Sequence, residues 1–196
     1  MLKREVGAVM AAVFSATTDL AGEPQRGPER ANLYEPGSAM QATPLRVEVL
    51  DGTRFRDTET NAVYRLYGIA TCLPGQVAHL GRQPWPCGTT ATAWLVAATL
   101  GKWLSCATLR DEAGERLARC ASADHPDLAG AMVRDGVAVT LPPTEHDPSV
   151  RAYVSAERDA RKAYRGLWAS SFEMPWEYRA RLAHSENRAP RAGASQ

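Results

Sequence analysis

The sequence predicts an α+β domain in which a small barrel of short antiparallel strands carries packed helices. Three observations support this prediction. Short segments with alternating apolar residues, such as 45–50, are separated by turn signals. A helical segment at 87–101 lies between strand segments. The chain has 196 residues, of which 44% are hydrophobic and 23% are charged, as expected for one globular domain with tails.

The first half of the domain is expected to contain mainly strands. LRVEVL at 45–50 alternates cleanly, and Asp51-Gly52 is a typical turn dipeptide. TRFRD at 53–57 and AVYRLYGI at 62–69 are the next two strand candidates. Residues 70–86 contain three prolines and two glycines, which predicts an irregular segment.

Helices alternate with strands in the second half. Apolar residues recur with helical spacing in three segments, and each segment ends at a glycine. Between them, two strand-like segments flank the polar turn RDEAGE, which predicts a hairpin. The expected order is a helix at 87–101, hairpin strands at 102–109 and 115–122, a helix at 126–136, a strand at 137–141 and a helix at 148–166.

The N-terminal segment has the composition of a secretory signal peptide. Lys3 and Arg4 precede a short apolar run that ends in small residues. The run is too short to span a bilayer, so no transmembrane segment is expected in the mature chain. The alternative is a frayed tail. The predicted organisation is a signal peptide at 1–18, a flexible linker at 19–43, the folded domain at 44–180 and a disordered tail at 181–196.

The four cysteines indicate disulfide bonds rather than a metal site. No C-x-x-C pair occurs and the histidines are scattered, so zinc-ligand spacing is absent. Cys106 and Cys120 are equidistant from Ala113 in the hairpin turn, which would place them opposite each other. The remaining pair is Cys72 with Cys87. Two pairs of buried free thiols are the alternative, but with the leader the cysteines favour a periplasmic or secreted protein.

Net charge argues against one class of partner. The formal net charge is +1 and the isoelectric point is about 7.7. A protein that grips a nucleic-acid backbone is usually far more basic. Nucleic acid is therefore not the expected partner, although a small nucleotide site stays compatible with this charge.

Between Leu45 and Arg179 the chain contains a series of fragments, which in order are VLDG, YRLYGIATC, WPCG, DEAGERLARC, DLAGAMVRDGVA, YVSAERDARKAYRGLW and PWEYR. This series resembles the staphylococcal nuclease (thermonuclease) family. The resemblance implies a five-stranded barrel of the oligonucleotide/oligosaccharide-binding type with three helices, and calcium-dependent phosphodiester hydrolysis. WPCG, the late cysteines and PWEYR are similar to an exported proteobacterial branch, which includes proteins encoded with rhizobial succinoglycan biosynthesis.

The resemblance also implies that most catalytic residues of the family are replaced here. Thr53 stands at the second Asp of the family motif D-G-D-T, and Ala70 at the second metal-binding Asp. Leu73 stands at the general-base Glu, and Glu115 at the second phosphate-binding Arg. Arg65 matches the first such Arg and is the retained candidate for a catalytic role.

Three alternatives could restore part of this chemistry. Thr71 lies near a family position whose backbone carbonyl binds calcium. A one-residue slip could bring in Arg116, although its alternation with Leu117 suggests that it points elsewhere. Asp57 and Glu59 could reach a metal, but their spacing fits a solvated turn equally well.

The expected function is therefore an exported, non-catalytic domain that supports exopolysaccharide (succinoglycan) biosynthesis. Its partner would be a glycan or the exopolysaccharide machinery, because barrels of this type also accommodate oligosaccharides. No cofactor is expected. The alternative is a nuclease with displaced ligands, which would need calcium, and a third reading is a module that binds protein or nucleic acid without cutting. The five tryptophans are expected in the core rather than in a sugar-stacking platform.

Overall fold

A computed structural model describes residues 44–145 and 147–188. They belong to a compact unit that runs from Ser38 to Gln196. The predicted signal peptide at 1–18 and linker at 19–43 lie outside the described residues, as does 189–196.

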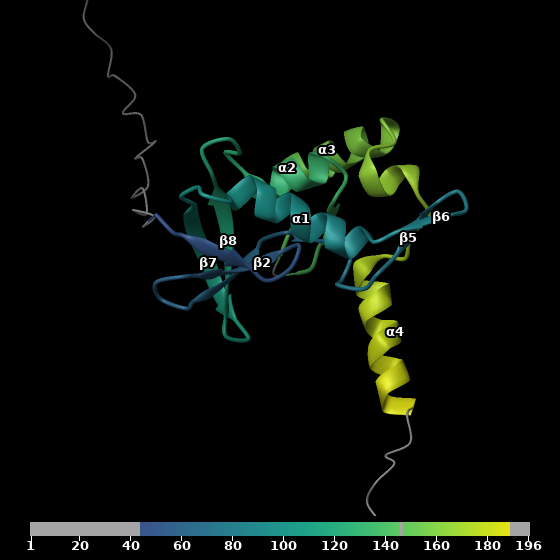
Figure 1. Cartoon of the computed structure of the whole chain (residues 1–196), viewed down its shortest axis with the longest axis horizontal. Helices are drawn as coiled ribbons and strands as arrows, with labels where there is room; N and C mark the ends of the chain where they lie inside the picture. The colour runs from purple at the N-terminus through teal and green to yellow at the C-terminus, as the bar shows by residue number, and fades with distance from the viewer. Residues whose placement is uncertain (1–43, 146, 189–196) are drawn as a thin grey trace, which may run out of the picture. The chain divides into compact units, whose positions relative to one another are not determined.

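The main sheet has five strands in the order β1-β2-β3-β8-β7. Figure 1 labels β2, β7 and β8 of this sheet. Neighbouring strands are antiparallel except β3 and β8, which are parallel. All five strands were predicted, because their apolar alternation buries one face: Phe55, Tyr64 and Leu66 are each at most 5% exposed. The strands are β1 (Val47–Val49), β2 (Arg54–Asp57), β3 (Val63–Leu66), β7 (Ser105–Glu112) and β8 (Glu115–Ala121).

Two small ribbons correct the prediction of a closed five-stranded barrel. β4 (Ile69–Ala70) pairs with β9 (Val139–Thr140) outside the main sheet. The chain leaves β3 through Gly68, whose φ of 78° lets it turn sharply. Between Leu45 and Leu104 a single bridge joins the two edges of the main sheet, so the described strands do not close.

The second ribbon lies in the segment that was predicted to be irregular. β5 (Ala78–Leu80) and β6 (Gln83–Trp85) form a hairpin around Gly81, whose φ is 61°. Strands of three residues are too short to show an alternating pattern. Pro84 in β6 also argued against a strand, yet proline is tolerated in an isolated edge ribbon.

The described part of the chain contains four α-helices, one more than predicted. α1 packs against β1, and α2 packs against β8 and α3. Among residues 44–145 and 147–188, no helix is both long enough and apolar enough to cross a membrane. The helices are α1 (Cys87–Thr99), α2 (Leu128–Arg134), α3 (Arg151–Lys162) and α4 (Pro175–Arg188), with a short 3₁₀ helix at Gly166–Ala169.

α4 corrects the predicted domain end at residue 180 and the disordered tail at 181–196, because it continues to Arg188. Pro175 occupies its first position, where the missing backbone N–H is not needed. Glu177 in the first turn and Arg188 in the last turn complement the helix dipole. Arg181 in this helix also forms an ion pair, at 2.8 Å, with Glu173, which lies just before the helix begins.

The main core is built where α1, α2 and α3 meet the sheet. Leu95, Met132 and Tyr153 are each at most 1% exposed there. The Tyr153 hydroxyl donates to Asp127 Oδ1 at 2.9 Å, and this carboxylate also caps α2 by accepting a hydrogen bond from the backbone N–H of Gly130. Burial, together with the Asp127 charge, raises the pKa of Tyr153 well above its usual range, so it stays a neutral donor. The prediction that all tryptophans are core residues is wrong for Trp103, which is 51% exposed.

Both predicted disulfides are confirmed, Cys72–Cys87 and Cys106–Cys120. Cys106 and Cys120 are direct partners in the β7–β8 register. Replacing both with serine should lower the free energy of unfolding by about 3 kcal/mol, because the bond closes a loop of 14-residue separation. Urea denaturation of the oxidised proteins measures this. Equal stability of the variant and the oxidised parent would contradict the prediction.

Asp57 holds the turn between β2 and β3 and is 2% exposed. Burial acts to raise its pKa, but hydrogen bonds from Thr60 and from the backbone N–H of Glu59 outweigh it, so the pKa lies below 3.8. A carboxylate with a lowered pKa stabilises the fold above its unfolded pKa, about 3.9, and loses that contribution as the pH falls further. Asp57→Asn should therefore destabilise the protein at pH 7, and the difference from the parent should shrink below about pH 4. Denaturation at several pH values tests this, and a constant difference would contradict it.

Candidate functional site

Two adjoining cavities form the candidate site. The smaller one, the loop pocket, has a volume of about 70 Å³ and lies along the loop 70–74. The larger one, the apolar cleft, has a volume of about 280 Å³. Arg65 and Leu141 line both cavities, so they share a wall.

The loop pocket brings together the positions that the family resemblance had singled out. Thr53, Arg65, Ala70 and Leu73 all line it, although they come from the turn after β1, from β3, from β4 and from the loop that follows β4. Glu115 does not line it but lies beside Arg65, at 3.2 Å from Nε to Oε2. The remaining lining residues are Asp51, Ile69, Thr71, Cys72, Pro74, Leu141 and Arg179.

A tight turn after β1 forms one side of the loop pocket. Asp51 Oδ1 accepts hydrogen bonds from the backbone N–H groups of Thr53 and Arg54, at 2.8 and 2.9 Å, as aspartate does in turns. A Cβ on Gly52 would lie 2.5 Å from Thr71 Oγ1. Glycine at this position therefore lets the turn pack directly against the loop 70–74.

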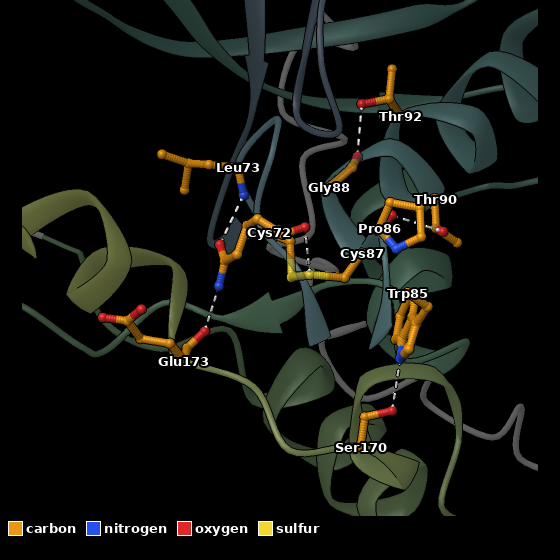
Figure 2. The surroundings of a disulfide bond; sticks show 11 residues. Cys72, Leu73, Trp85, Pro86, Cys87, Gly88, Thr90, Thr92, Ser170 and Glu173 are labelled. Atoms are coloured by element: carbon orange, nitrogen blue, oxygen red, sulfur yellow. Dashed lines mark hydrogen bonds between the residues drawn. A yellow bond between two sulfur atoms is a disulfide. The ribbon is translucent and has the colours of Figure 1, made fainter. Parts of the chain in front are cut away.

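The loop 70–74 is fixed on one side to the start of α1, as Figure 2 shows. The Cys72–Cys87 bond joins the loop to the first residue of the helix, and both cysteines are at most 2% exposed. Gly88 permits this approach, because a Cβ there would lie 1.9 Å from the carbonyl oxygen of Leu73.

Gln76 fixes the same loop to the segment that leads into α4. Its side chain is buried, with 1% exposed. The backbone N–H of Leu73 donates to Gln76 Oε1 at 3.0 Å, and Gln76 Nε2 donates to the carbonyl oxygen of Glu173 at 2.7 Å. Figure 2 shows Leu73 and Glu173 at the two ends of this link. The loop therefore has little freedom to move relative to α1 or α4.

Arginines and carboxylates alternate across the sheet beside these cavities. Arg54 and Arg65 are direct partners in the β2–β3 register, so two like charges face each other. Glu115 lies between them and pairs with both, at 3.0 Å to Arg54 and 3.2 Å to Arg65. Arg54 also pairs with Asp51 at 2.6 Å. Hydrogen bonds to Asp51 and Glu115 raise the pKa of Arg54 above its ordinary value.

The alternation continues to the apolar cleft. Arg65 Nη2 lies 2.9 Å from Glu112 Oε2, which in turn lies 3.2 Å from Arg110. Arg110 pairs with Asp147 at 2.5 Å, and this hydrogen-bonded contact raises the pKa of Arg110. The full charge chain is Asp51, Arg54, Glu115, Arg65, Glu112, Arg110 and Asp147. Four carboxylates and three guanidinium groups leave a formal charge of −1.

Of the alternative residues proposed from the sequence, Thr71 lines the loop pocket, whereas Arg116, Asp57 and Glu59 do not join the site. Arg116 donates to the Tyr64 hydroxyl at 2.8 Å, and its guanidinium lies over the Tyr64 ring. Asp57 accepts hydrogen bonds within its own turn, and neither Asp57 nor Glu59 lines either cavity. Within the described ranges, no group of three or more His, Cys, Asp or Glu residues is placed to hold a metal ion.

α4 supplies two residues to the site that the sequence analysis did not identify. Trp176 lines the apolar cleft and Arg179 lines the loop pocket. They are three positions apart, so they share one face of the helix. The i, i+3 spacing within PWEYR was the available signal, but the segment was read as the end of the domain. Arg179 forms no hydrogen bond or ion pair with any residue that the structure describes.

Comparison with known proteins assigns the family. The family model described as staphylococcal nuclease homologue matches residues 65–170, which is more than half of the chain. The chain belongs to this family. A relative in Schizophyllum commune (strain H4-8 / FGSC 9210), "Probable endonuclease LCL3", is 33% identical over 125 residues. The match covers 55% of this chain and 42% of that protein, so the chain spans less than half of that relative's length.

The Gln76 link leads to a test of how the loop is held. Gln76→Ala should lower the free energy of unfolding by roughly 1–3 kcal/mol, because it leaves the partly buried N–H of Leu73 and C=O of Glu173 without these partners. It should also speed hydrogen exchange at the Leu73 amide. Gln83→Ala, at an exposed position in β6, is the matched control and should change neither quantity. Unchanged protection of Leu73 in Gln76→Ala would show that the loop is held by other contacts.

Proposed function

We propose that this domain uses the staphylococcal nuclease fold to bind a ligand and does not hydrolyse phosphodiesters. The observation that carries the proposal is that Arg65, the retained catalytic candidate, already forms ion pairs within the protein. Its guanidinium already pairs with Glu112 and Glu115 on the site side. In the family this arginine meets the charge on phosphate, so a phosphate would here compete with two carboxylates.

The side chains of the loop pocket are a poor match for calcium. Calcium takes six to eight oxygen ligands, among them several carboxylates. Asp51 is the single carboxylate that lines the pocket, and its oxygens already accept hydrogen bonds from Thr53 and from Arg54. The guanidinium groups of Arg65 and Arg179 line the same pocket and would repel a cation. The proposal therefore includes no metal cofactor.

The site also lacks a general base that could activate a water molecule. Leu73 has no proton acceptor where the family has its general base. Loss of a general base lowers rates by roughly 10²–10⁴. Loss of the metal carboxylates removes the electrostatic stabilisation that the ion would give. Together these changes favour binding over hydrolysis as the function of the site.

We also propose that the protein works outside the cytoplasm, in the periplasm or as a secreted protein, and that it supports exopolysaccharide production by binding a glycan or its machinery. Two disulfides support an oxidising compartment. The resemblance to proteins encoded with succinoglycan biosynthesis supports the pathway, and the fold type accommodates oligosaccharides. The charge chain, at −1, argues against a polyanionic strand such as nucleic acid.

A calcium-dependent nuclease is the second candidate. Family membership and the printed name of the Schizophyllum relative favour it. It requires metal ligands other than those of the family motif.

A nuclease assay separates the two candidates. The full-length oxidised protein should show no calcium-dependent cleavage of denatured DNA. A variant with Thr53→Asp, Ala70→Asp, Leu73→Glu, Glu115→Arg and Arg54→Thr should gain cleavage. Arg54→Thr is included because Arg54 stands at the Thr of D-G-D-T, and an arginine at 115 would otherwise face two others. Activity of the parent that is abolished by a chelator and by Arg65→Ala would overturn the proposal.

A further inference from the structure

We propose that the loop pocket is an anion site in which Arg179 of α4 holds a carboxylate or phosphate group of a small ligand. This inference rests on the proposed function in one respect, namely that no cation occupies the pocket. It assigns a role to Arg179, the last residue of the PWEYR fragment, which lies outside the family's catalytic motifs quoted above.

Charge is the first argument. Three charged residues line the loop pocket: Asp51, Arg65 and Arg179. Asp51 is neutralised by Arg54 at 2.6 Å, and Arg65 by Glu115 and Glu112. Arg179 has no ion-pair partner among residues 44–145 and 147–188. Arg179 offsets the formal charge of −1 on the charge chain, and it is the one charged residue that lines the loop pocket without an ion-pair partner among the described residues.

Unused hydrogen-bond donors are the second argument. Thr71 is 7% exposed and lines the pocket, yet its hydroxyl forms no hydrogen bond with any described residue. Buried donors normally have acceptors. A bound oxyanion would supply acceptors for the Thr71 hydroxyl and the Arg179 guanidinium together.

Size limits the ligand group. At about 70 Å³ the loop pocket has room for a few heavy atoms, which fits one oxyanion but not a sugar ring or a nucleoside. The rest of the ligand would lie in the apolar cleft across Arg65 and Leu141, against Leu117, Val150 and Trp176. Two guanidinium groups and two carboxylates line the cleft, so it is neutral overall. The expected ligand has one terminal oxyanion and an uncharged, partly apolar body.

The rigidity of the loop makes such a site preformed. Loop 70–74 is fixed by Cys72–Cys87 and by Gln76, which also reaches the segment before α4. Thr71 and Arg179 are therefore linked through Gln76 to one rigid framework. Binding would need little ordering of the protein, which favours affinity for a small group.

Titration of the full-length oxidised protein tests the site. The probes are sodium phosphate and sodium acetate, each compared with sodium chloride at equal ionic strength. Amide chemical shifts of residues 70–74 and the side-chain Nε–H shift of Arg179 are followed by NMR. At least one oxyanion should give saturable shifts that chloride does not give. Comparing phosphate with acetate shows whether the pocket binds a phosphate or a carboxylate more tightly.

Two variants make the test specific. Arg179→Gln should weaken binding about tenfold or more, because it removes a charge-assisted hydrogen bond. Arg181→Gln is the matched control: it removes the same charge from the same helix, but Arg181 pairs with Glu173 and does not line the loop pocket. Thr71→Val should weaken binding several-fold while keeping the side-chain shape. Thermal melts check that each variant is folded.

The outcomes are distinct. Saturable shifts that are lost in Arg179→Gln and kept in Arg181→Gln support the anion site. Equal effects of the two arginine variants, or no saturation by either anion, overturn it. Calcium is titrated in parallel: calcium binding at 70–74 together with DNA cleavage would overturn the proposed function. Absence of both calcium and anion binding would overturn the anion site alone.

Discussion

The contact on which the site depends is that of Glu115 with two arginines from neighbouring strands. Arg54 and Arg65 are cross-strand partners, and two guanidinium groups in that position repel each other. Glu115 accepts a hydrogen bond from Arg54 and forms an ion pair with Arg65. Its carboxylate therefore offsets the repulsion between the two guanidinium groups and links β2, β3 and β8. Half-exposed ion pairs contribute little individually, but a shared carboxylate with two partners fixes both side chains. The guanidinium of Arg65 is therefore engaged by two carboxylates of the protein, Glu112 and Glu115.

The residues at positions 54 and 115, which both differ from the family motifs, are therefore explained by their contact with each other. The family motifs place Thr and Arg at these positions, and this chain has Arg and Glu. A lone change to Glu115 would have put a carboxylate beside a single arginine, whereas Arg54 gives it a second partner and also neutralises Asp51. The charges at these positions thus form contacts within the protein. Arg179, on a helix that follows the 3₁₀ turn, lines the loop pocket without an ion-pair partner among the described residues.

The sequence predicted the elements whose signal is local. Alternation located the five strands of the main sheet, and glycine stops located α1, α2 and α3. The disulfides were predictable because Cys106 and Cys120 are symmetric about a turn, which fixes their register. β5 and β6 were missed because three-residue strands show no period. α4 was missed because its exposed residues are polar and only two of its side chains enter the cavities.

The residues of the site could be predicted from the sequence, but the ion pairs between them could not. The resemblance singled out Thr53, Ala70, Leu73 and Glu115, yet nothing local shows that Glu115 meets Arg54, 61 residues earlier. That contact depends on the parallel β3–β8 pairing, which joins Tyr64 to Arg116 and so brings the start of β8 beside β2 and β3. The pairing of strands that are far apart in the sequence decides which charged side chains form ion pairs. These ion pairs in turn influence whether the pocket suits a cation or an anion. The chemistry of this site is thus set less by the residues of the loop 70–74 than by the strands and the helix that surround it.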